Sequence, residues 1–323
     1  MNLALSNKTK RKVKKYFSLQ FGAGMVYSFF RALLLLGISY VILYPLLIKL
    51  SASFLSQVDM YDMTVKWIPK TPTLENFQIV MEKMKYGKHL FYTLFISATG
   101  AFLQVACTTL AAYAFARLKF PGRGLIFAIV ILTLVVPPQT YMVPSYMQFR
   151  FFDFFGLGQL LGLEPISLIN TPLPLYIMSI GCVATKNGLF IYIMKQFFAN
   201  LPKEIEEAAE VDGAGVFKTF FFIMLPNAKP ALTTISVFAF VWIYNDLYMA
   251  STYMPSAPMF STALSTLVFR VSESYSNSTP IDVVTLSVLT NAGALLIILP
   301  LIILFCVAQK QFVEGVERTG ITG

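Results

Sequence analysis

The residues that most often carry enzyme chemistry are scarce in this chain of 323 residues. Its only histidine is His89, which rules out any metal motif built on two histidines. Its cysteines, Cys107, Cys182 and Cys306, lie in apolar stretches without a neighbour at metal-ligand spacing, and we interpret them as packing residues. The sequence contains no G-x-x-x-x-G-K-[ST] phosphate loop. It therefore predicts no catalysis, no cofactor and no metal site, and any ATP used in its work would bind to another subunit.

One polar cluster interrupts an apolar segment, and it consists of Trp242, Tyr244, Asn245 and Asp246. A carboxylate near a membrane is costly unless it is wet or paired. Aromatic rings pack on the C–H faces of sugars and amides bind hydroxyl groups, so the cluster suits a substrate path for sugars. The alternative is an interfacial aromatic belt with a helix-capping Asn or Asp. The sequence leaves both interpretations open.

A charged loop broken by glycine, at residues 200–230, is the most informative segment of the chain. Asn200 is a candidate cap for a helix that begins at Pro202, because proline is well tolerated in a first helical turn. Acidic residues follow near the positive end of the helix dipole, and Gly213 is a natural helix stop. Helical spacing puts four residues on one narrow face, namely Ile205, Ala208, Ala209 and Asp212.

A second short helix follows this stop and ends at Pro226. Its apolar stripe consists of Phe217, Phe220, Phe221 and Met224. The loop is thus predicted to be two short helices that meet at Asp212–Gly213. From the spacing alone, it is either a docking surface or a structured linker packed on its own protein.

The composition is that of a membrane protein. The chain is 56% hydrophobic and 13% charged, whereas a soluble domain carries roughly a quarter charged residues. A bilayer span needs about 20 apolar residues, and six segments qualify: 29–50, 90–116, 124–146, 173–199, 231–253 and 284–308. We therefore predict an all-α fold with six transmembrane helices in one domain at 29–308. A basic tail at 1–28 precedes this domain and a short tail at 309–323 follows it.

Several features subdivide or flank these segments. Pro121–Gly122 favours a tight turn between the second and third spans. The flanking Arg117 and Arg123 are expected to anchor this turn at the lipid headgroups. Prolines in the stretch 135–146 predict a helix break at the outer membrane edge. Lys186 interrupts the fourth segment, where it would snorkel, face a wet interior or mark a break between two shorter pieces.

The net charge of +9 is placed for a membrane rather than for nucleic acid. Lys and Arg cluster before the first span, around the turn at 117–123, in the loop at 200–230 and after the last span. With six spans, all of these positions fall on one side, which the positive-inside rule assigns to the cytoplasm. The first outside loop also carries five lysines, and four acids offset part of their charge. We predict that both termini and the 200–230 loop are cytoplasmic.

The loop resembles the "EAA" loop of the membrane subunits of ATP-binding-cassette importers. Positions in register with that pattern are Glu207, Ala208, Ala209, Asp212, Gly213, Ala214, Phe220, Leu225, Pro226 and Pro230. The run AYAFARLKFPGR at 112–123 also resembles the carbohydrate-uptake branch of this family. The similarity extends over nearly all of the chain from about residue 30 onward.

The resemblance implies a type I permease subunit in a bacterial plasma (inner) membrane. Its implied partners are a second, related permease, two cytoplasmic ATPase subunits and an extracytoplasmic solute-binding protein. The residues in register, Glu207 to Pro226, would couple ATP hydrolysis to translocation of a sugar or oligosaccharide by alternating access. Alternatives are glycerol phosphate or another polyol derivative as the substrate, or an ATP-independent secondary transporter or channel. A membrane scaffold is a third class, but it would not need polar residues inside the spans.

Overall fold

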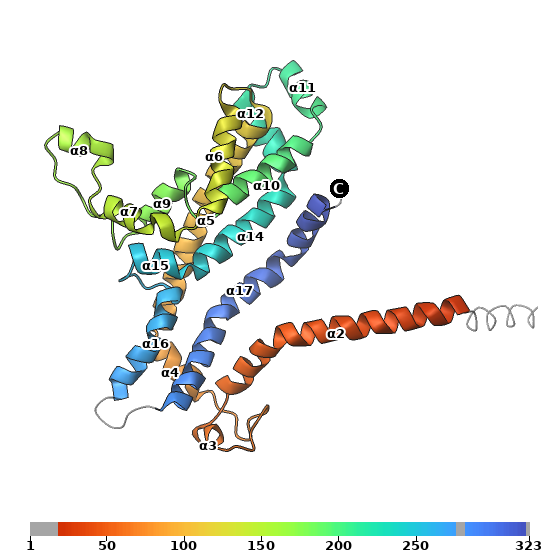
Figure 1. The fold of residues 1–323 in the computed structure, drawn as a ribbon, viewed down its shortest axis with the longest axis vertical. Helices are drawn as coiled ribbons and strands as arrows, with labels where there is room; N and C mark the ends of the chain where they lie inside the picture. The colour runs from red at the N-terminus through yellow and green to blue at the C-terminus, as the bar shows by residue number, and fades with distance from the viewer. Residues whose placement is uncertain (1–18, 276–281, 321–323) are drawn as a thin grey trace, which may run out of the picture.

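The computed structural model describes residues 19–275 and 282–320, and helices joined by loops make up this part of the chain (Figure 1). Its extended structure is one isolated bridge between Phe152 and Ile166. The predicted all-α class is confirmed. Most of the predicted basic tail, residues 1–18, and residues 321–323 of the predicted C-terminal tail lie outside the described residues.

Three helices in the described ranges are long and apolar enough to cross a membrane on their own, judged by length and composition. They are α2 (Leu19–Ser53), α5 (Tyr86–Arg117) and α17 (Val283–Gly320), and they contain the predicted first, second and sixth spans. Each is a nearly continuous apolar run without a helix stop, although Pro45 in α2 and Pro300 in α17 are accommodated inside the helices.

The other predicted spans are bent or broken. Helices α6 (Arg123–Val135) and α7 (Gln139–Arg150) meet at 104°, because Pro137 and Pro138 lack the amide hydrogens that would continue the helix. A second bent pair meets at 81°, between Val216–Asn227 and α14 (Lys229–Asn245), after which Asp246 separates α14 from α15 (Leu247–Tyr253). If each bent pair is one span, the described residues hold up to five spans.

The predicted fourth span at 173–199 is two helices, not one. These are α9 (Leu173–Ile180) and α10 (Asn187–Asn200), and the break between them contains Cys182 and Lys186 at positive φ. Lys186 therefore marks a break in the predicted fourth span. The predicted number of six spans is therefore not confirmed.

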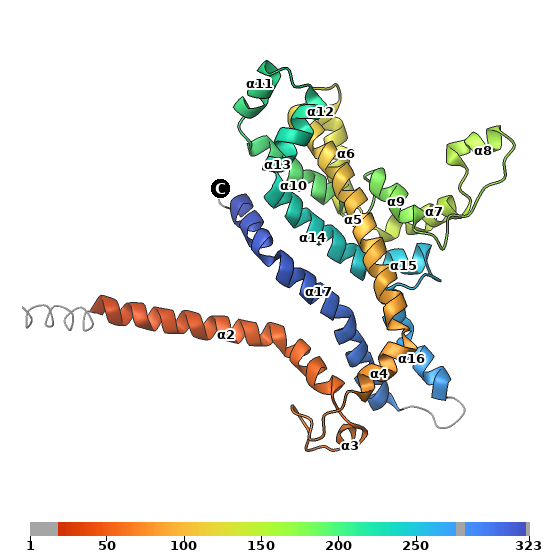
Figure 2. The same ribbon diagram turned by 180° about the vertical axis from the view of Figure 1, so that it is seen from behind.

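Helix α5 runs through the body of the protein and packs most extensively against α10 and α14 (Figures 1 and 2). Several of its polar side chains face inward: Ser97, Gln104 and Thr108 are buried, and Gln104 Nε2 donates to Thr185 O at 2.9 Å. Helix α17 lies against α14 and α2. There Lys49 Nζ donates to Asn291 Oδ1 at 3.1 Å, and this polar contact holds the two helices together.

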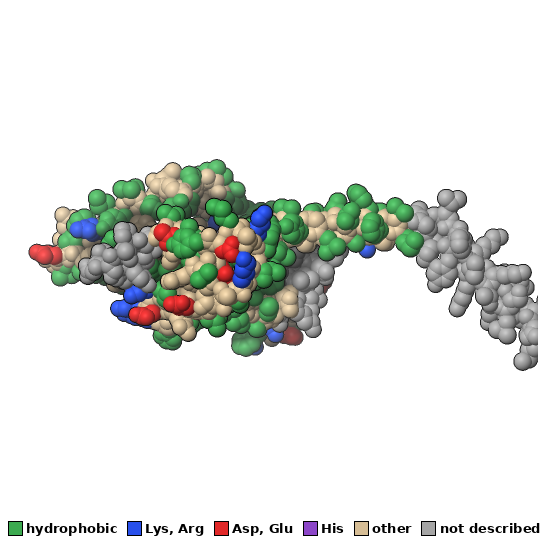
Figure 3. Space-filling view, turned by 90° about the horizontal axis from the view of Figure 1, so that it is seen from below, with side chains coloured by type: hydrophobic (Ala, Val, Ile, Leu, Met, Phe, Trp, Pro, Cys, Tyr) green, Lys and Arg blue, Asp and Glu red, His purple; other side chains and the backbone are tan. Residues whose placement is uncertain are grey.

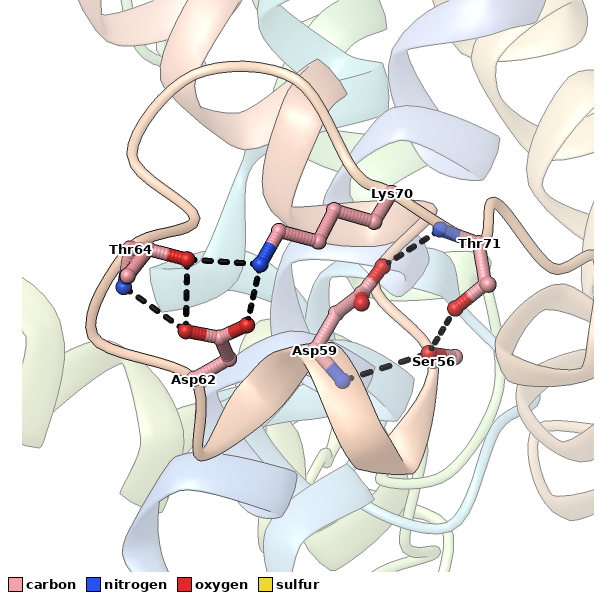
Figure 4. A network of polar contacts seen from close by, with 6 residues as sticks. All are labelled: Ser56, Asp59, Asp62, Thr64, Lys70 and Thr71. Carbon is pink, nitrogen blue, oxygen red and sulfur yellow. Dashed lines mark hydrogen bonds and ion pairs between the residues drawn. The ribbon is translucent and has the colours of Figure 1, made fainter.

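One end of the molecule carries α3 (Gln57–Met60), α4 (Glu75–Lys83) and α16 (Phe260–Tyr275), and charged side chains are displayed on it (Figure 3). A polar network orders the loop after α2 (Figure 4). Asp59 is buried and accepts from the Thr71 backbone at 2.8 Å, while Asp62 pairs with Lys70. The hydrogen bond from Lys70 holds the pKa of the Asp62 carboxyl well below its usual range.

The opposite end carries the C-terminal part of α17 and the segment 200–230, so these two lie at the same end of the helical body (Figure 1). A hairpin-like connection with the short helices η1 (Phe154–Gly156) and α8 (Leu157–Leu160) projects from α7. Helices α7, α9 and α15 gather on one side of α5 and α14 in both views (Figures 1 and 2).

Candidate functional site

Helix α11 (Glu204–Val211) is the exposed helix of the 200–230 loop. Its first turn carries Glu204, Glu206 and Glu207, which the positive helix terminus stabilises. The predicted cap at Asn200 is wrong, since Asn200 is the last residue of α10 and the residue before α11 is Lys203, which makes no side-chain cap. Leu201 precedes a proline and is extended, so the chain leaves one helix before it begins the next.

The end of α11 depends on Gly213. Its φ is +76°, in the left-handed region that glycine adopts at little cost. The Gly213 backbone donates to Glu210 O at 3.0 Å, and the Ala214 backbone donates to Ala209 O at 2.9 Å. These bonds satisfy carbonyls at the helix end, and the chain then turns toward α12 (Val216–Thr219).

The residues in register with the EAA pattern divide between surface and interior. Glu207, Ala208, Asp212 and Gly213 are exposed, Ala214 is half-buried, and Ala209 is buried. Helical spacing predicts one face for these residues, and along that face Ala208 and Asp212 are exposed whereas Ala209 is buried. The exposed part also includes apolar side chains, with Val211 88% and Phe217 71% exposed, which the spacing of residues does not predict.

The aromatic stripe is interrupted by a π-helical turn, η2 (Phe220–Met224), which is followed by α13 (Leu225–Asn227). Phe220 and Met224 are buried, whereas Phe217 and Phe221 are exposed, so the four residues do not form one buried stripe. Leu225 is half-buried and Pro226 exposed. Pro226 lies within α13, so it does not end the helix as predicted, and the bend follows at Ala228.

A buried ion pair ties α11 to α5. Arg117 Nε lies 3.2 Å from Glu206 Oε2, and these side chains are 7% and 15% exposed. Tyr113 of α5 donates to Glu206 Oε1 at 3.1 Å, and Arg117 also donates to Leu201 O. The prediction that Arg117 anchors a turn at the headgroups is wrong, because its guanidinium is withdrawn into the protein. Sequence spacing gave no signal for this pair, which joins separate helices.

The structure separates the four residues of the predicted substrate path. Tyr244 is buried between helices and donates to Ile297 O at 2.8 Å. Asn245 is exposed, and its Nδ2 donates to Val241 O of its own helix at 3.0 Å. Trp242 and Asp246, in contrast, line a common cavity.

That cavity has a volume of about 330 Å³ and is bordered by α5, α7, α9, α14 and α15. Its polar lining includes Gln104, Lys186 and Asp246. Asp246 Oδ1 accepts from the Met249 backbone at 2.9 Å and so caps α15. The Trp242 ring stacks with Phe190 and Phe238, and Lys186 Nζ lies 5.6 Å from its centroid. Among the described residues, no group of three His, Cys, Asp or Glu could hold a metal ion.

Comparison with known proteins places these features in context. The family model described as "Binding-protein-dependent transport system inner membrane component" matches residues 104–318. The osmoprotective compounds uptake permease protein GgtD of Synechocystis sp. is 33% identical over 262 residues, which are 78% of this chain and 77% of that protein. The maltodextrin transport system permease protein MdxG of Bacillus subtilis is 31% identical over 292 residues, 88% of this chain and 93% of that protein.

A solved structure shares the fold. One chain in the crystal structure of a bacterial ABC transporter involved in the import of the acidic polysaccharide alginate aligns with a TM-score of 0.69 at 21% identity. The alignment covers 90% of this chain and 98% of that chain. The overall arrangement of helices therefore matches a fold that is known from experiment.

Proposed function

Because this chain belongs to the family of inner membrane components of binding-protein-dependent transport systems, we propose that it translocates a sugar or oligosaccharide by alternating access, driven by ATP. Relatives named for maltodextrin and galactooligosaccharide transport support the substrate class. Glycerol phosphate or another polyol derivative is the alternative substrate, and one relative is named for uptake of osmoprotective compounds rather than of a sugar. The reaction of this chain is movement of a solute across the membrane, without bond chemistry.

The observation that carries the proposal is the exposed tip formed by α11 and α12. Glu207 and Asp212 supply negative charge, while Val211 and Phe217 supply exposed apolar surface next to it. Mixed acidic and aromatic surface of this kind suits a partner with a basic, apolar groove. The Glu206–Arg117 pair connects this tip to α5. We assign the tip, together with the buried Ala209 and Phe220 that support it, to docking one of two cytoplasmic ATPase subunits, while the other docks on the second permease.

Helix α2 supports pairing with a second, related permease. The apolar window of this helix is not buried by the rest of the chain, and its N-terminal part projects away from the body (Figures 1 to 3). Lipid would tolerate this exposure, but a helix held only at one end gains packing against a neighbouring subunit. The apolar groove of about 700 Å³ between α5 and α14 is a surface on which the corresponding helix of the partner would fit.

The end of the molecule with α3 and α4 is assigned to the outside, where a solute-binding protein would deliver the substrate. The network of Asp59, Asp62 and Lys70 gives this loop a defined shape. The opposite end, with α11 and the end of α17, is assigned to the cytoplasm. This orientation follows the distribution of Lys and Arg along the chain.

Purification of the tagged chain from its native membrane tests the function directly. We expect an ATPase subunit and a second permease to co-purify in stoichiometric amounts, and uptake of a labelled sugar to stop when the ATPase is inactivated. Sugar uptake that continues at the normal rate without a functional ATPase would instead identify an ATP-independent transporter or channel.

A further inference from the structure

Three separate helix breaks meet at the cavity beside Trp242. Pro138 and Gln139 lie where α6 turns into α7, Thr185 and Lys186 lie between α9 and α10, and Asp246 lies between α14 and α15. Each break comes from a different part of the sequence, and all line the same space. The unbroken helix α5 closes one side with Gln104, whose amide holds the α9–α10 break through Thr185 O.

Convergent breaks indicate a water-filled space. Backbone that is not helical cannot satisfy its own hydrogen bonds in hydrocarbon, so it is tolerated at membrane depth only where it is buried in protein or lines an aqueous cavity. Broken helices are also the elements that hold substrates in other transporter folds. The cavity of about 330 Å³ is at the lower end of the range of about 300–1,000 Å³ found for small-molecule sites.

The charges on its wall define what it can bind. Lys186 provides an ammonium with three donors and Asp246 a carboxylate with about four lone-pair sites, of which helix capping uses only part. Within the described residues, no ion pair joins Lys186 to Asp246. Two opposite charges that line one cavity without pairing can bind the same kind of solute group. Such a group accepts a hydrogen bond from the ammonium and donates one to the carboxylate.

We propose that this cavity is a subsite for one neutral, polyhydroxylated ring, held by this subunit itself. The proposal rests on the proposed function, since it places a station of the sugar path in this chain. One hydroxyl oxygen accepts from the Lys186 ammonium, and another hydroxyl donates to the Asp246 carboxylate. Because Lys186 and Asp246 carry opposite charges, their effects on a net-charged solute offset each other, and a neutral group that both accepts and donates hydrogen bonds uses both. The Trp242 ring is already stacked with two phenylalanines, so it orients Lys186 rather than serving as a stacking platform.

Protection of a cysteine in the cavity tests this subsite without a transport assay. In a chain with its three cysteines replaced by alanine, Thr185→Cys is modified by a cationic methanethiosulfonate reagent in the detergent-purified transporter. We expect glucose and galactose to slow modification severalfold, with glucuronate much weaker and glycine betaine without effect. Ser256→Cys, on an exposed loop outside the cavity, should be modified at the same rate with or without sugar.

Charge variants identify the groups responsible. Lys186→Gln and Asp246→Asn should each raise the half-protecting sugar concentration about 10–100-fold, as expected for one hydrogen bond to a charged group. Lys195→Gln is the matched control, because Lys195 also lies over an aromatic ring, 3.9 Å from the centroid of Phe127, but does not line the cavity. It should leave protection unchanged.

Equal protection in the charge variants and the control, stronger protection by glucuronate or betaine, or no protection by either sugar in the unsubstituted cavity would each overturn the subsite. Co-purification of the ATPase is scored on the same preparation. A transporter that retains its ATPase but shows no protection refutes the subsite and leaves the proposed function standing. Protection in a chain that binds no ATPase supports the subsite and refutes the proposed ATP-driven function.

Discussion

Glu206 and Glu207 are neighbours in α11 that lie in different surroundings. Glu206 is turned inward onto Arg117 and Tyr113, while Glu207 is exposed at the tip. A buried ion pair adds little net stability, but removing one partner leaves an uncompensated charge. One acid therefore holds the helix on its own protein, and the other is available to a partner.

Substitution of each acid by alanine should separate these roles. We expect Glu206→Ala to destabilise the chain by about 3–5 kcal/mol, because the Arg117 guanidinium loses its counterion in a buried site. Glu207→Ala should change stability by no more than about 0.5 kcal/mol but reduce recovery of the ATPase. Thermal unfolding in detergent and pull-down yield measure the two effects. Equal unfolding temperatures for both variants would contradict the assignment.

Gly213 and Gly215 provide a second comparison at single residues. A Cβ at either position meets nothing within 4 Å, but φ is +76° at Gly213 and −74° at Gly215. Any effect at Gly213 is therefore backbone strain, of about 1–2 kcal/mol for an ordinary side chain and less for asparagine. A β-branched side chain is worse still in this region.

Uptake and ATPase coupling should consequently fall in the order Gly213→Asn, Gly213→Ala, Gly213→Val, with membrane insertion intact in all three. Gly215→Val should transport normally, because its backbone is already extended. Loss of transport in Gly215→Val to the same degree as in Gly213→Val would show that bulk at the tip, not backbone geometry, is what matters.

At the scale of elements, α10 and α6 approach each other at a glycine. A Cβ on Gly188 would lie 2.6 Å from Thr133 Oγ1 and 2.8 Å from Val130 O, and the second contact is with backbone that cannot rotate away. This approach holds the N-terminal end of α10, next to Lys186, against α6. The position of the α9–α10 break is therefore fixed by packing as well as by local conformation.

Gly188→Ala should force these helices apart. Overpacking of this kind costs about 1–3 kcal/mol, so we expect a lower unfolding temperature and reduced transport. Gly124→Ala, in α6 with open space around its Cβ, is the control and should match the parent protein. An unchanged unfolding temperature in Gly188→Ala would mean that the two helices are not in this close contact.

At the scale of the whole molecule, α11 and the loop after α2 lie at opposite ends of the helical body (Figures 1 and 2). Glu210 of α11 is exposed, and Met63 of the loop is 95% exposed. These two positions report the sidedness of the protein, because a membrane-impermeant reagent reaches only one of them in a sealed cell.

In a background with Cys107, Cys182 and Cys306 replaced by alanine, Met63→Cys should be labelled by an impermeant maleimide in intact cells. Glu210→Cys should be labelled only after the membrane is opened, as the positive-inside rule requires. Lysed cells, in which both positions react, are the control. The reverse pattern in intact cells would invert the orientation.

The sequence by itself determined the class of the protein and the location of the segment that we propose for coupling. Long apolar runs give helices wherever they occur, and a left-handed residue such as Gly213 ends a helix through local sterics. The prolines at 137 and 138 break α6 from α7 for an equally local reason. Features of this kind depend on neighbours along the chain, so residue types and spacing are sufficient to predict them.

Only the tertiary structure decided which residues act together. Periodicity gives a helix a face but not the neighbour of that face, so it could not pair Glu206 with Arg117 or bring Lys186 and Asp246 to one cavity. Adjacency in the sequence suggests that Tyr244 and Asn245 act with Trp242 and Asp246. The packing of α14 against α17 instead buries Tyr244 away from the cavity. The physical reason is that packing between distant helices sets burial and charge pairing, and these decide which polar groups are open to a solute.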